Sequence, residues 1–349
     1  MTQERGKISV GVVGAGVIGR RVLNAIMLQP DMTLSGMADI VVDWRIEFLV
    51  NDGVPLFAAT QDVAQSYSDA GFKLSGSLDD LIASSDVIVD CTPKGIGAKN
   101  AESYRRAGRP FIVQGGEKHA VTGHSFVAEA TYDSAMGRDA TRVVSCNTTS
   151  IVRTLGTLKR AGLLKKARGT LLRRATDPWE SHLGGIMNTL VPEPVIPSHQ
   201  GPDAQHVDPD LDVITTAIKV PETLAHLHSW YVDLTRPATK DEVLDAFAAS
   251  PRILLVDGHK GLSALNSIKE AMAMKGRPNA DLYEVALWSN ILSVDGTELC
   301  YNYMVDNQAI VIPETIDAIR ALSGREIHSQ ASISMTNAAL GIGTGGLRL

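Results

Sequence analysis

Residues 8–19 read ISVGVVGAGVIG, and this stretch decides the fold of the first part of the chain. An apolar run with the length of a buried strand precedes Gly14, and a helical run follows Gly19. Glycines at positions 14, 16 and 19 match the Gly-x-Gly-x-x-Gly fingerprint of dinucleotide binding. In that fingerprint the first glycine permits a tight turn, the second lets a pyrophosphate approach, and the third lets helix and strand pack closely. We therefore predict that Gly14, Gly16 and Gly19 bind a dinucleotide, against the alternative of a purely structural glycine turn.

Asp39 ends the next predicted strand and lies 20 positions beyond Gly19. A carboxylate at that place accepts hydrogen bonds from the ribose 2′-hydroxyl and repels a 2′-phosphate. The sequence therefore favours NAD, with NADP as the second possibility. A solvated loop carboxylate is the alternative, because Asp43 and Arg45 stand nearby.

The wider pattern predicts two domains. Residues 1–142 alternate strand-like and helical runs, which indicates an α/β fold with a doubly wound parallel sheet, a Rossmann domain. Residues 143–312 carry longer stretches of alternating polar and apolar residues, which indicates an α+β catalytic domain with a mixed, largely antiparallel sheet. Residues 313–349 are expected to form a helix that returns to the NAD-binding domain, followed by a flexible tail.

Composition narrows the class of protein. The 349 residues are 44% hydrophobic and 21% charged, with a formal net charge of −6 and no basic run, so we expect no nucleic-acid partner. We expect no membrane partner either, because no apolar run reaches the roughly 20 residues of a membrane span. Three widely spaced cysteines argue against a disulfide framework and a zinc site, so no metal is expected. The first residues lack the apolar core of a signal peptide, which predicts a cytoplasmic protein.

Cys146 is the candidate nucleophile. It follows the strand-like residues 142–144 and precedes the helical pattern that starts at 151, which places the thiol at a helix N-terminus. Such an end favours negative charge, so we expect it to lower the pKa of the thiol and to hold an oxyanion. The alternative is a small buried apolar side chain, as most free cysteines are.

Polar residues of the second half could meet this cysteine. His226 and His228 are two apart, so in a strand they share one face, and either could be the general base or a structural histidine. Arg174, beside Arg173, closes a predicted strand and could hold phosphate. His199 and Gln200 lie in a polar turn suited to a phosphate, and Asn307 could reach a nicotinamide amide.

These motifs together resemble the archaeal-type, or type II, phosphorylating glyceraldehyde-3-phosphate dehydrogenases. The resemblance covers nearly the whole chain and is carried by residues 14–19, 90–100, 114–119, 145–149, 173–174, 197–199 and 226–228. It implies Cys146 as nucleophile, His226 as base with His228 as the alternative, and Ser145, Asn147 and Thr148 as substrate-binding neighbours. It also implies substrate binding by His199 and Gln200, and cofactor binding by Val17, Ile18, Gly116, Arg174 and Asn307.

The activity implied is oxidation of glyceraldehyde 3-phosphate by NAD(P), through a cysteine hemithioacetal and thioester. Inorganic phosphate releases the product 1,3-bisphosphoglycerate, in glycolysis or gluconeogenesis, and a homotetramer is implied. Four positions depart from the family pattern: Gln200 replaces a histidine, Ser150 a glycine, Asp39 a lysine and Asn307 a glutamine. Two alternatives stay open, a semialdehyde or acyl-phosphate dehydrogenase with the same cysteine chemistry, and a non-enzymatic NAD-binding redox sensor.

Overall fold

The computed structural model describes residues 6–178 and 187–343, and these residues form two compact units. Unit 1 comprises residues 6–144 and 312–340, and unit 2 comprises the described residues of 145–311 together with 341–343. The stretch predicted to be a flexible tail begins at Gly341, and residues 344–349 lie outside the described residues. Among the described residues, no helix is both long enough and apolar enough to cross a membrane.

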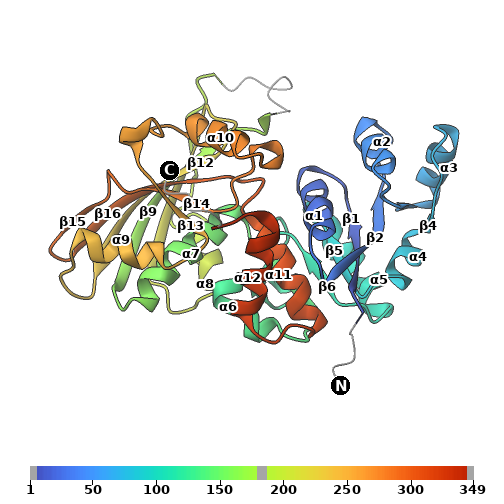
Figure 1. Ribbon diagram of the computed structural model, residues 1–349, viewed down its shortest axis with the longest axis horizontal. Coiled ribbons are helices and arrows are strands. Elements are labelled where there is room, and N and C mark those ends of the chain that lie inside the picture. Colours follow the sequence, from blue (N-terminus) through green and yellow to red (C-terminus); the bar gives the residue numbers. More distant parts are fainter. Residues whose placement is uncertain (1–5, 179–186, 344–349) are drawn as a thin grey trace. The chain divides into compact units, whose positions relative to one another are not determined.

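Unit 1 is built on a parallel sheet of eight strands in the order β4-β3-β2-β1-β5-β6-β8-β7 (Figure 1). The strands are β1 (Ile8–Val13), β2 (Met32–Asp39), β3 (Leu56–Ala58), β4 (Gly76–Ser77), β5 (Val87–Asp90), β6 (Phe111–Val113), β7 (Ser125–Phe126) and β8 (Ala140–Val143). The helices are α1 (Val17–Met27), α2 (Trp44–Asn51), α3 (Gln61–Asp69), α4 (Leu78–Ala83), α5 (Ile96–Arg106), α6 (Ala128–Ala135), α11 (Val311–Ser323) and α12 (Ser329–Leu340). This confirms the predicted α/β class.

The strand order creates a switch point beside β1. From β1 the chain moves to β2 on one side, and the strand that pairs on its other side is β5. Ligands of open α/β sheets bind at the carboxyl ends of the strands at such a point. The buried side chains of Val10, Val12 and Ile88 give this region an apolar core.

Helices α11 and α12 belong to unit 1, although they follow unit 2 in the chain. Arg320 of α11 is fully buried, and its guanidinium donates to both carboxylate oxygens of Asp31 at 2.7 and 2.8 Å. It also donates to Gln29 and Thr336. Because a buried guanidinium needs such partners, these contacts attach α11 to the segment between α1 and β2.

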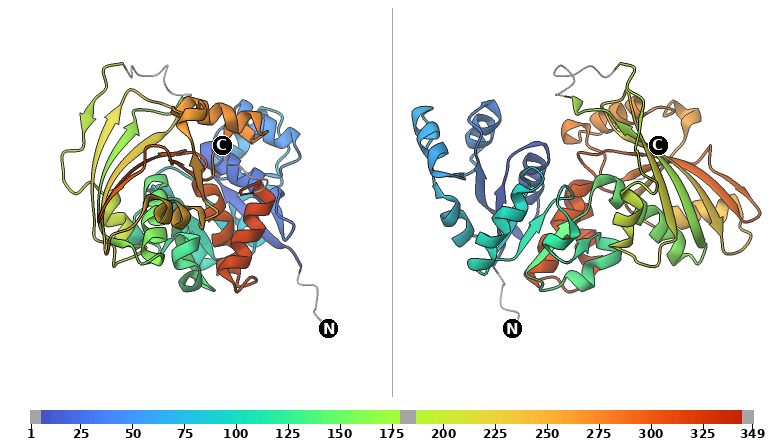
Figure 2. Two further views of the ribbon diagram at one scale, coloured as in Figure 1. Left: turned by 60° about the vertical axis from the view of Figure 1, so that its left-hand side comes forward. Right: turned by 180° about the vertical axis from the view of Figure 1, so that it is seen from behind.

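Unit 2 contains a mixed sheet in the order β10-β11-β9-β12-β16-β14-β13, with β15 paired to β16. The strands are β9 (Leu164–Arg174), β10 (Val191–Pro192), β11 (Val213–Val220), β12 (His226–Leu234), β13 (Ile253–Val256), β14 (Val285–Trp288), β15 (Ser293–Asp295) and β16 (Glu298–Val305). The helices are α7 (Cys146–Arg160), α8 (Gln200–Gln205), α9 (Lys240–Ala248) and α10 (Leu265–Met274). Figure 2 shows the long strands lying side by side with helices against the sheet. Two neighbouring pairs are parallel and the rest antiparallel, as expected for the mixed sheet.

Candidate active site

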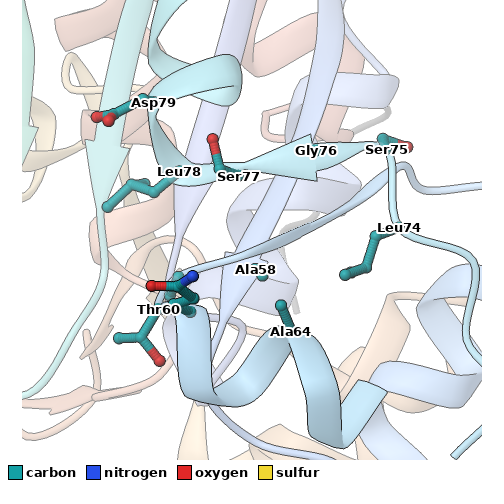
Figure 3. A pocket seen from close by; sticks show the side chains of 11 residues that line it. Ala58, Thr60, Ala64, Leu74, Ser75, Gly76, Ser77, Leu78 and Asp79 are labelled. Carbon is teal, nitrogen blue, oxygen red and sulfur yellow. The ribbon is translucent and has the colours of Figure 1, made fainter. Parts of the chain in front are cut away.

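Unit 1 has a cavity of about 800 Å³ at the carboxyl ends of β1, β2 and β5. Five predicted cofactor-binding residues line it, namely Gly14, Gly16, Val17, Ile18 and Asp39. A second hollow of about 650 Å³ is lined by Thr60, Ser77 and Leu78 among others (Figure 3). It shares Ala59, Thr60 and Leu78 with the larger cavity. The switch point of the sheet is therefore where the glycine turn opens into a space.

Each glycine of the turn has its own physical reason. Gly14 has φ +88°, a conformation that side chains disfavour. A Cβ on Gly19 would lie 1.8 Å from the carbonyl oxygen of Gly14, so no larger residue fits beneath the turn. A Cβ on Gly16 would meet nothing within 4 Å, and its φ of −69° is ordinary. Backbone conformation therefore explains Gly14 and packing explains Gly19, whereas neither requires a glycine at position 16.

Substitution of Gly16 can separate an effect on NAD binding from an effect on stability. We expect Gly16→Ala to fold with a melting temperature within about 2 °C of wild type, because alanine fits the backbone. NAD should bind at least about tenfold more weakly, because the methyl group occupies the approach of the pyrophosphate. Gly156→Ala, in the helix interior of unit 2, is the matched control and should leave NAD affinity unchanged. Equal NAD affinity in Gly16→Ala and wild type, measured by calorimetry, would contradict this reading of the turn.

Asp39 is held toward the same cavity by backbone groups. Its Oδ2 accepts from the amide of Ala15 at 2.5 Å, and its Oδ1 accepts from the amides of Ile40 and Val41 at 2.6 and 3.0 Å. The neighbouring Arg45 is engaged by Asp43, whose carboxylate accepts from its guanidinium and raises the pKa of that arginine. Asp39 is thus a fixed negative charge at the rim, which suits a ribose diol.

The other predicted cofactor-binding residues are divided between the units. Gly116 lies in unit 1, in the turn after β6, and a Cβ there would approach Lys94, which also lines the cavity. Arg174 and Asn307 lie in unit 2. The carbonyl oxygen of the Asn307 side chain is buried and has no hydrogen-bond partner among the described residues.

In unit 2, Cys146 is the first residue of α7, and Val144 and Ser145 separate it from the end of β8. The Ser145 side chain caps the helix by accepting from the amide of Thr148 at 3.3 Å. The Ser145 and Thr148 hydroxyls are 2.9 Å apart, and Thr148 donates to Asp203 at 2.8 Å. Hydrogen bonds of Ser145, before Cys146, and of Thr148, after it, therefore hold the first turn of α7 in place.

The prediction that the helix N-terminus lowers the pKa of the Cys146 thiol is wrong. Burial raises the pKa of Cys146 to about 11, although Arg174, Arg173 and the amide of Asn147 each pull it down. Asp306 adds a negative charge that also raises it. The helix end is a local effect, and here desolvation by the surrounding unit outweighs it. The resting side chain is thus a thiol, which must lose its proton before or during attack.

This pKa predicts how alkylation of Cys146 depends on pH. At pH 7 only about one molecule in ten thousand carries the thiolate. The rate of reaction with iodoacetamide should therefore rise about tenfold per pH unit from pH 7 to 10 and level off near pH 11. Mass spectrometry of the peptide that contains Cys146 measures this rate separately from Cys91 and Cys300. A plateau below pH 8 would show instead that the thiol is activated in the resting protein.

His226 and His228 lie on the same buried face of β12 but have different partners. His226 Nδ1 accepts from the backbone amide of Arg174 at 3.1 Å. His228 has both ring nitrogens engaged, Nε2 with Asn147 Oδ1 at 2.8 Å and Nδ1 with the Tyr303 hydroxyl at 2.9 Å. Burial lowers the pKa of His228 to about 3 and that of His226 well below 6.5, with help from the nearby arginines. Both rings are neutral at neutral pH.

Two guanidinium groups stand beside these residues at the end of β9. Arg173 pairs with Glu193 at 2.5 Å and Arg174 with Asp177 at 2.9 Å. Their buried Nε atoms have no hydrogen-bond partner among the described residues. Because buried donors are normally satisfied, these atoms point to an anionic ligand such as a phosphate group.

The two predicted substrate-binding residues of the polar turn have opposite environments. Gln200 is fully buried, and neither its amide nitrogen nor its carbonyl oxygen has a partner in the part of the chain that the structure describes. The side chain of His199 is 63% exposed, with Nδ1 4.0 Å from a Glu193 oxygen. Leaving a buried amide unpaired costs about 1–3 kcal/mol, so Gln200 is the stronger candidate for a ligand contact.

The structure also brings in acidic residues to which the sequence assigned no role, although Asp203 belongs to the polar turn of His199 and Gln200. Asp306 is buried beside the cysteine and pairs with Lys269 at 2.6 Å. Asp177 accepts from both Arg174 and Gln308, and Asp203 receives the Thr148 hydroxyl. Only the Arg174–Asp177 pair has a short-range signal, an opposite charge three residues away. In the described residues, no cluster of three or more His, Cys, Asp or Glu forms a candidate metal site.

Two protein-family models match this chain, one in each unit. Residues 8–118 match the family model described as dihydrodipicolinate reductase, N-terminus, and residues 145–277 match glyceraldehyde 3-phosphate dehydrogenase, C-terminal domain. The glyceraldehyde-3-phosphate dehydrogenase of Metallosphaera sedula is 43% identical over 97% of this chain and 99% of that protein. The chain belongs to the glyceraldehyde-3-phosphate dehydrogenase family. The enzymes of the same name from Methanobrevibacter smithii and Halobacterium salinarum are each 41% identical over 96% of this chain, and 99% and 100% of their own lengths. Membership of this dehydrogenase family extends over both units.

Proposed function

We propose that this chain oxidises glyceraldehyde 3-phosphate to 1,3-bisphosphoglycerate with NAD and inorganic phosphate. The observation that carries the proposal is the cluster in unit 2, where Cys146 begins a helix within the electrostatic influence of two arginines. A thiol that can become a nucleophile and cations that can hold phosphate suit a phosphorylated aldehyde. The cavity of unit 1, with its glycine turn and Asp39, fits the dinucleotide.

Substrate binding follows from the unsatisfied groups of unit 2. Arg173, Arg174 and Gln200 present buried polar atoms that lack partners among the described residues, and a phosphate or hydroxyl group would satisfy them. The amides of Cys146 and Asn147, at the start of α7, are proposed to face the oxygen of the aldehyde, because the Thr148 amide already donates to Ser145. His199 is exposed and is proposed as an outer contact of the phosphate.

His226 is proposed to handle the proton of the reacting group. Because its Nδ1 accepts from the Arg174 amide, the neutral ring carries its proton on Nε2. That N–H can polarise the aldehyde oxygen, so that the carbon becomes more susceptible to attack by the thiol. His228, by contrast, has both nitrogens engaged inside the protein and is not proposed as the base.

The chemistry then has three steps. Sulfur of Cys146 forms a bond to the aldehyde carbon while the thiol proton passes to the carbonyl oxygen, which gives a hemithioacetal. Loss of the proton from the hemithioacetal hydroxyl and of a hydride from its carbon gives a thioester; NAD, when bound in the cavity of unit 1, would supply the acceptor for that hydride. A phosphate oxygen attacks the thioester carbon, the C–S bond breaks, and the thiolate leaves and regains a proton.

The deciding experiment is a steady-state assay of NADH formation. Glyceraldehyde 3-phosphate should support turnover that requires phosphate or arsenate, with aspartate semialdehyde and acetaldehyde plus coenzyme A at least about a hundredfold less efficient. Preference for either of those two substrates would identify a related semialdehyde or acyl-transfer dehydrogenase. No NADH with any aldehyde would favour an NAD-binding redox sensor and sink the proposal.

NAD rather than NADP is the proposed preferred cofactor because of the Asp39 carboxylate. Asp39→Asn removes the negative charge that repels a 2′-phosphate, so the ratio of kcat/KM for NADP to that for NAD should rise at least about tenfold. Asp52→Asn, on an exposed side chain at the end of α2, is the matched control. An unchanged ratio in Asp39→Asn would show that this carboxylate does not select the cofactor.

A homotetramer completes the proposal and rests on the family resemblance alone. Light scattering coupled to size-exclusion chromatography measures the mass, which should be four times that of the 37.3 kDa chain.

A further inference from the structure

A ring of four close polar contacts, three of them hydrogen bonds, adjoins the cysteine in unit 2. The side-chain oxygen of Asn147 meets Nε2 of His228 at 2.8 Å, and Nδ1 of His228 meets the Tyr303 hydroxyl at 2.9 Å. The Tyr303 oxygen lies 3.3 Å from Ser150 Oγ, and Ser150 donates back to the carbonyl oxygen of Asn147 at 2.8 Å. The ring therefore starts and ends on the residue that follows Cys146.

Three elements build this ring by their own regular geometry. Asn147 and Ser150 are three residues apart on α7, so they share one face of the helix. His228 on β12 and Tyr303 on β16 are direct partners in the antiparallel register, and their ring centroids are 4.9 Å apart. All four residues are buried, so water does not compete for these bonds.

The donors and acceptors around the ring are consistent with a neutral His228. An amide oxygen only accepts, so Nε2 of His228 must carry the proton that goes to Asn147. Nδ1 is then an acceptor, and the Tyr303 hydroxyl is the donor that satisfies it. The Ser150 hydroxyl donates its proton to the backbone carbonyl oxygen of Asn147. These assignments use the proton of each hydroxyl once, so the 3.3 Å approach of the Tyr303 and Ser150 oxygens is a contact without its own proton. The other three contacts are hydrogen bonds, and they hold Asn147 by its side chain and by its backbone carbonyl.

We infer that His228 is a positioning residue, which with Tyr303 and Ser150 holds the first turn of α7 so that Cys146 attacks in one orientation. This inference rests on the proposed function, because it gives His228 a role in the addition of the Cys146 thiol to the aldehyde. It also gives a use to Ser150, which stands where the family pattern has a glycine. Small displacements of a nucleophile lower the rate far more than they lower binding, so the expected effect is on kcat.

Tyr303→Phe tests the inference, because it removes the hydroxyl group of Tyr303 and leaves the aromatic side chain in place. We expect kcat to fall about tenfold while the KM for NAD stays within twofold. Ser150→Ala should act similarly, and the double variant should lose about as much as the worse single variant, because each substitution releases the same residue, Asn147. Tyr301→Phe is the matched control, on the same strand and face but outside the ring, and should change kcat by less than twofold.

Hydrogen exchange of the peptide that contains residues 146–151 is a second readout that needs no substrate. Exchange should quicken about tenfold in Tyr303→Phe and stay at the wild-type rate in Tyr301→Phe. Faster exchange with unchanged kcat would reduce the ring to a structural role and overturn the inference. Losses of kcat that multiply in the double variant would also overturn the inference. A loss of activity above about ten-thousandfold in His228→Gln, with normal activity in Tyr303→Phe, would instead make His228 the base. If the wild-type chain leaves glyceraldehyde 3-phosphate unoxidised, the proposed function fails, and exchange alone decides whether the ring holds the turn.

Discussion

Replacing Cys146 by serine is expected to lower NADH formation from glyceraldehyde 3-phosphate by at least about a thousandfold. A serine hydroxyl has nearly the same size, so α7 should still begin at this position. Its oxygen is a far weaker nucleophile than sulfur at the same site, and an ester is a poorer acyl donor to phosphate than a thioester. The measurement is the initial rate of absorbance increase at 340 nm with saturating NAD and phosphate.

Two controls make that result specific. NAD should bind the Cys146→Ser variant with the affinity of wild type, since the cofactor cavity lies in unit 1 and the substitution in unit 2. Cys300→Ser, on β16, should retain normal turnover, which excludes a general need for thiols. Cys91 is less suitable as a control, because it lines the cofactor cavity. Normal turnover in Cys146→Ser would remove the covalent mechanism altogether.

The sequence could predict the parallel sheet of unit 1 because its signals are local. Residues 8–13, 32–38 and 86–93 are predicted strands, and the structure has β1 at Ile8–Val13, β2 at Met32–Asp39 and β5 at Val87–Asp90. The glycine turn sits between strand and helix as expected, and steric contacts of Gly14 and Gly19 account for it. The two-residue strands β4, β7 and β10 escape prediction, because pairing across the sheet rather than any periodicity defines them.

The candidate site was only partly predictable, because its electrostatics arise from tertiary packing. The helix-end argument considered α7 by itself and expected a low thiol pKa, whereas burial within unit 2 raises it to about 11. The alternation of His226 and His228 correctly indicated a shared face. It could not separate their roles, since the Arg174 amide and the Tyr303 hydroxyl reach them from neighbouring strands. No pattern of spacing in the chain reveals such partners.

His226 is the site of the second large expected effect. His226→Ala should lower kcat about a thousandfold, because general acid–base catalysis contributes about a hundredfold to ten-thousandfold. Part of the loss should return in His226→Gln, whose amide can still donate a hydrogen bond to the aldehyde oxygen but cannot exchange a proton. Single-turnover kinetics with rapid mixing measure the acylation step directly.

The pH profile gives an independent check on this histidine. Burial and the adjacent His228, Arg174 and Arg173 hold the pKa of His226 well below 6.5, so the ring is already neutral at pH 6. Raising the pH from 6 to 8 therefore does not change its charge, and any rise of kcat/KM in that range should follow ionisation of the thiol or the substrate. The rise should accordingly persist in His226→Gln at a lower rate. If the rise disappears in His226→Gln while Cys146 alkylation keeps its wild-type pH dependence, the ring titrates near neutral pH and its proposed neutral state is wrong.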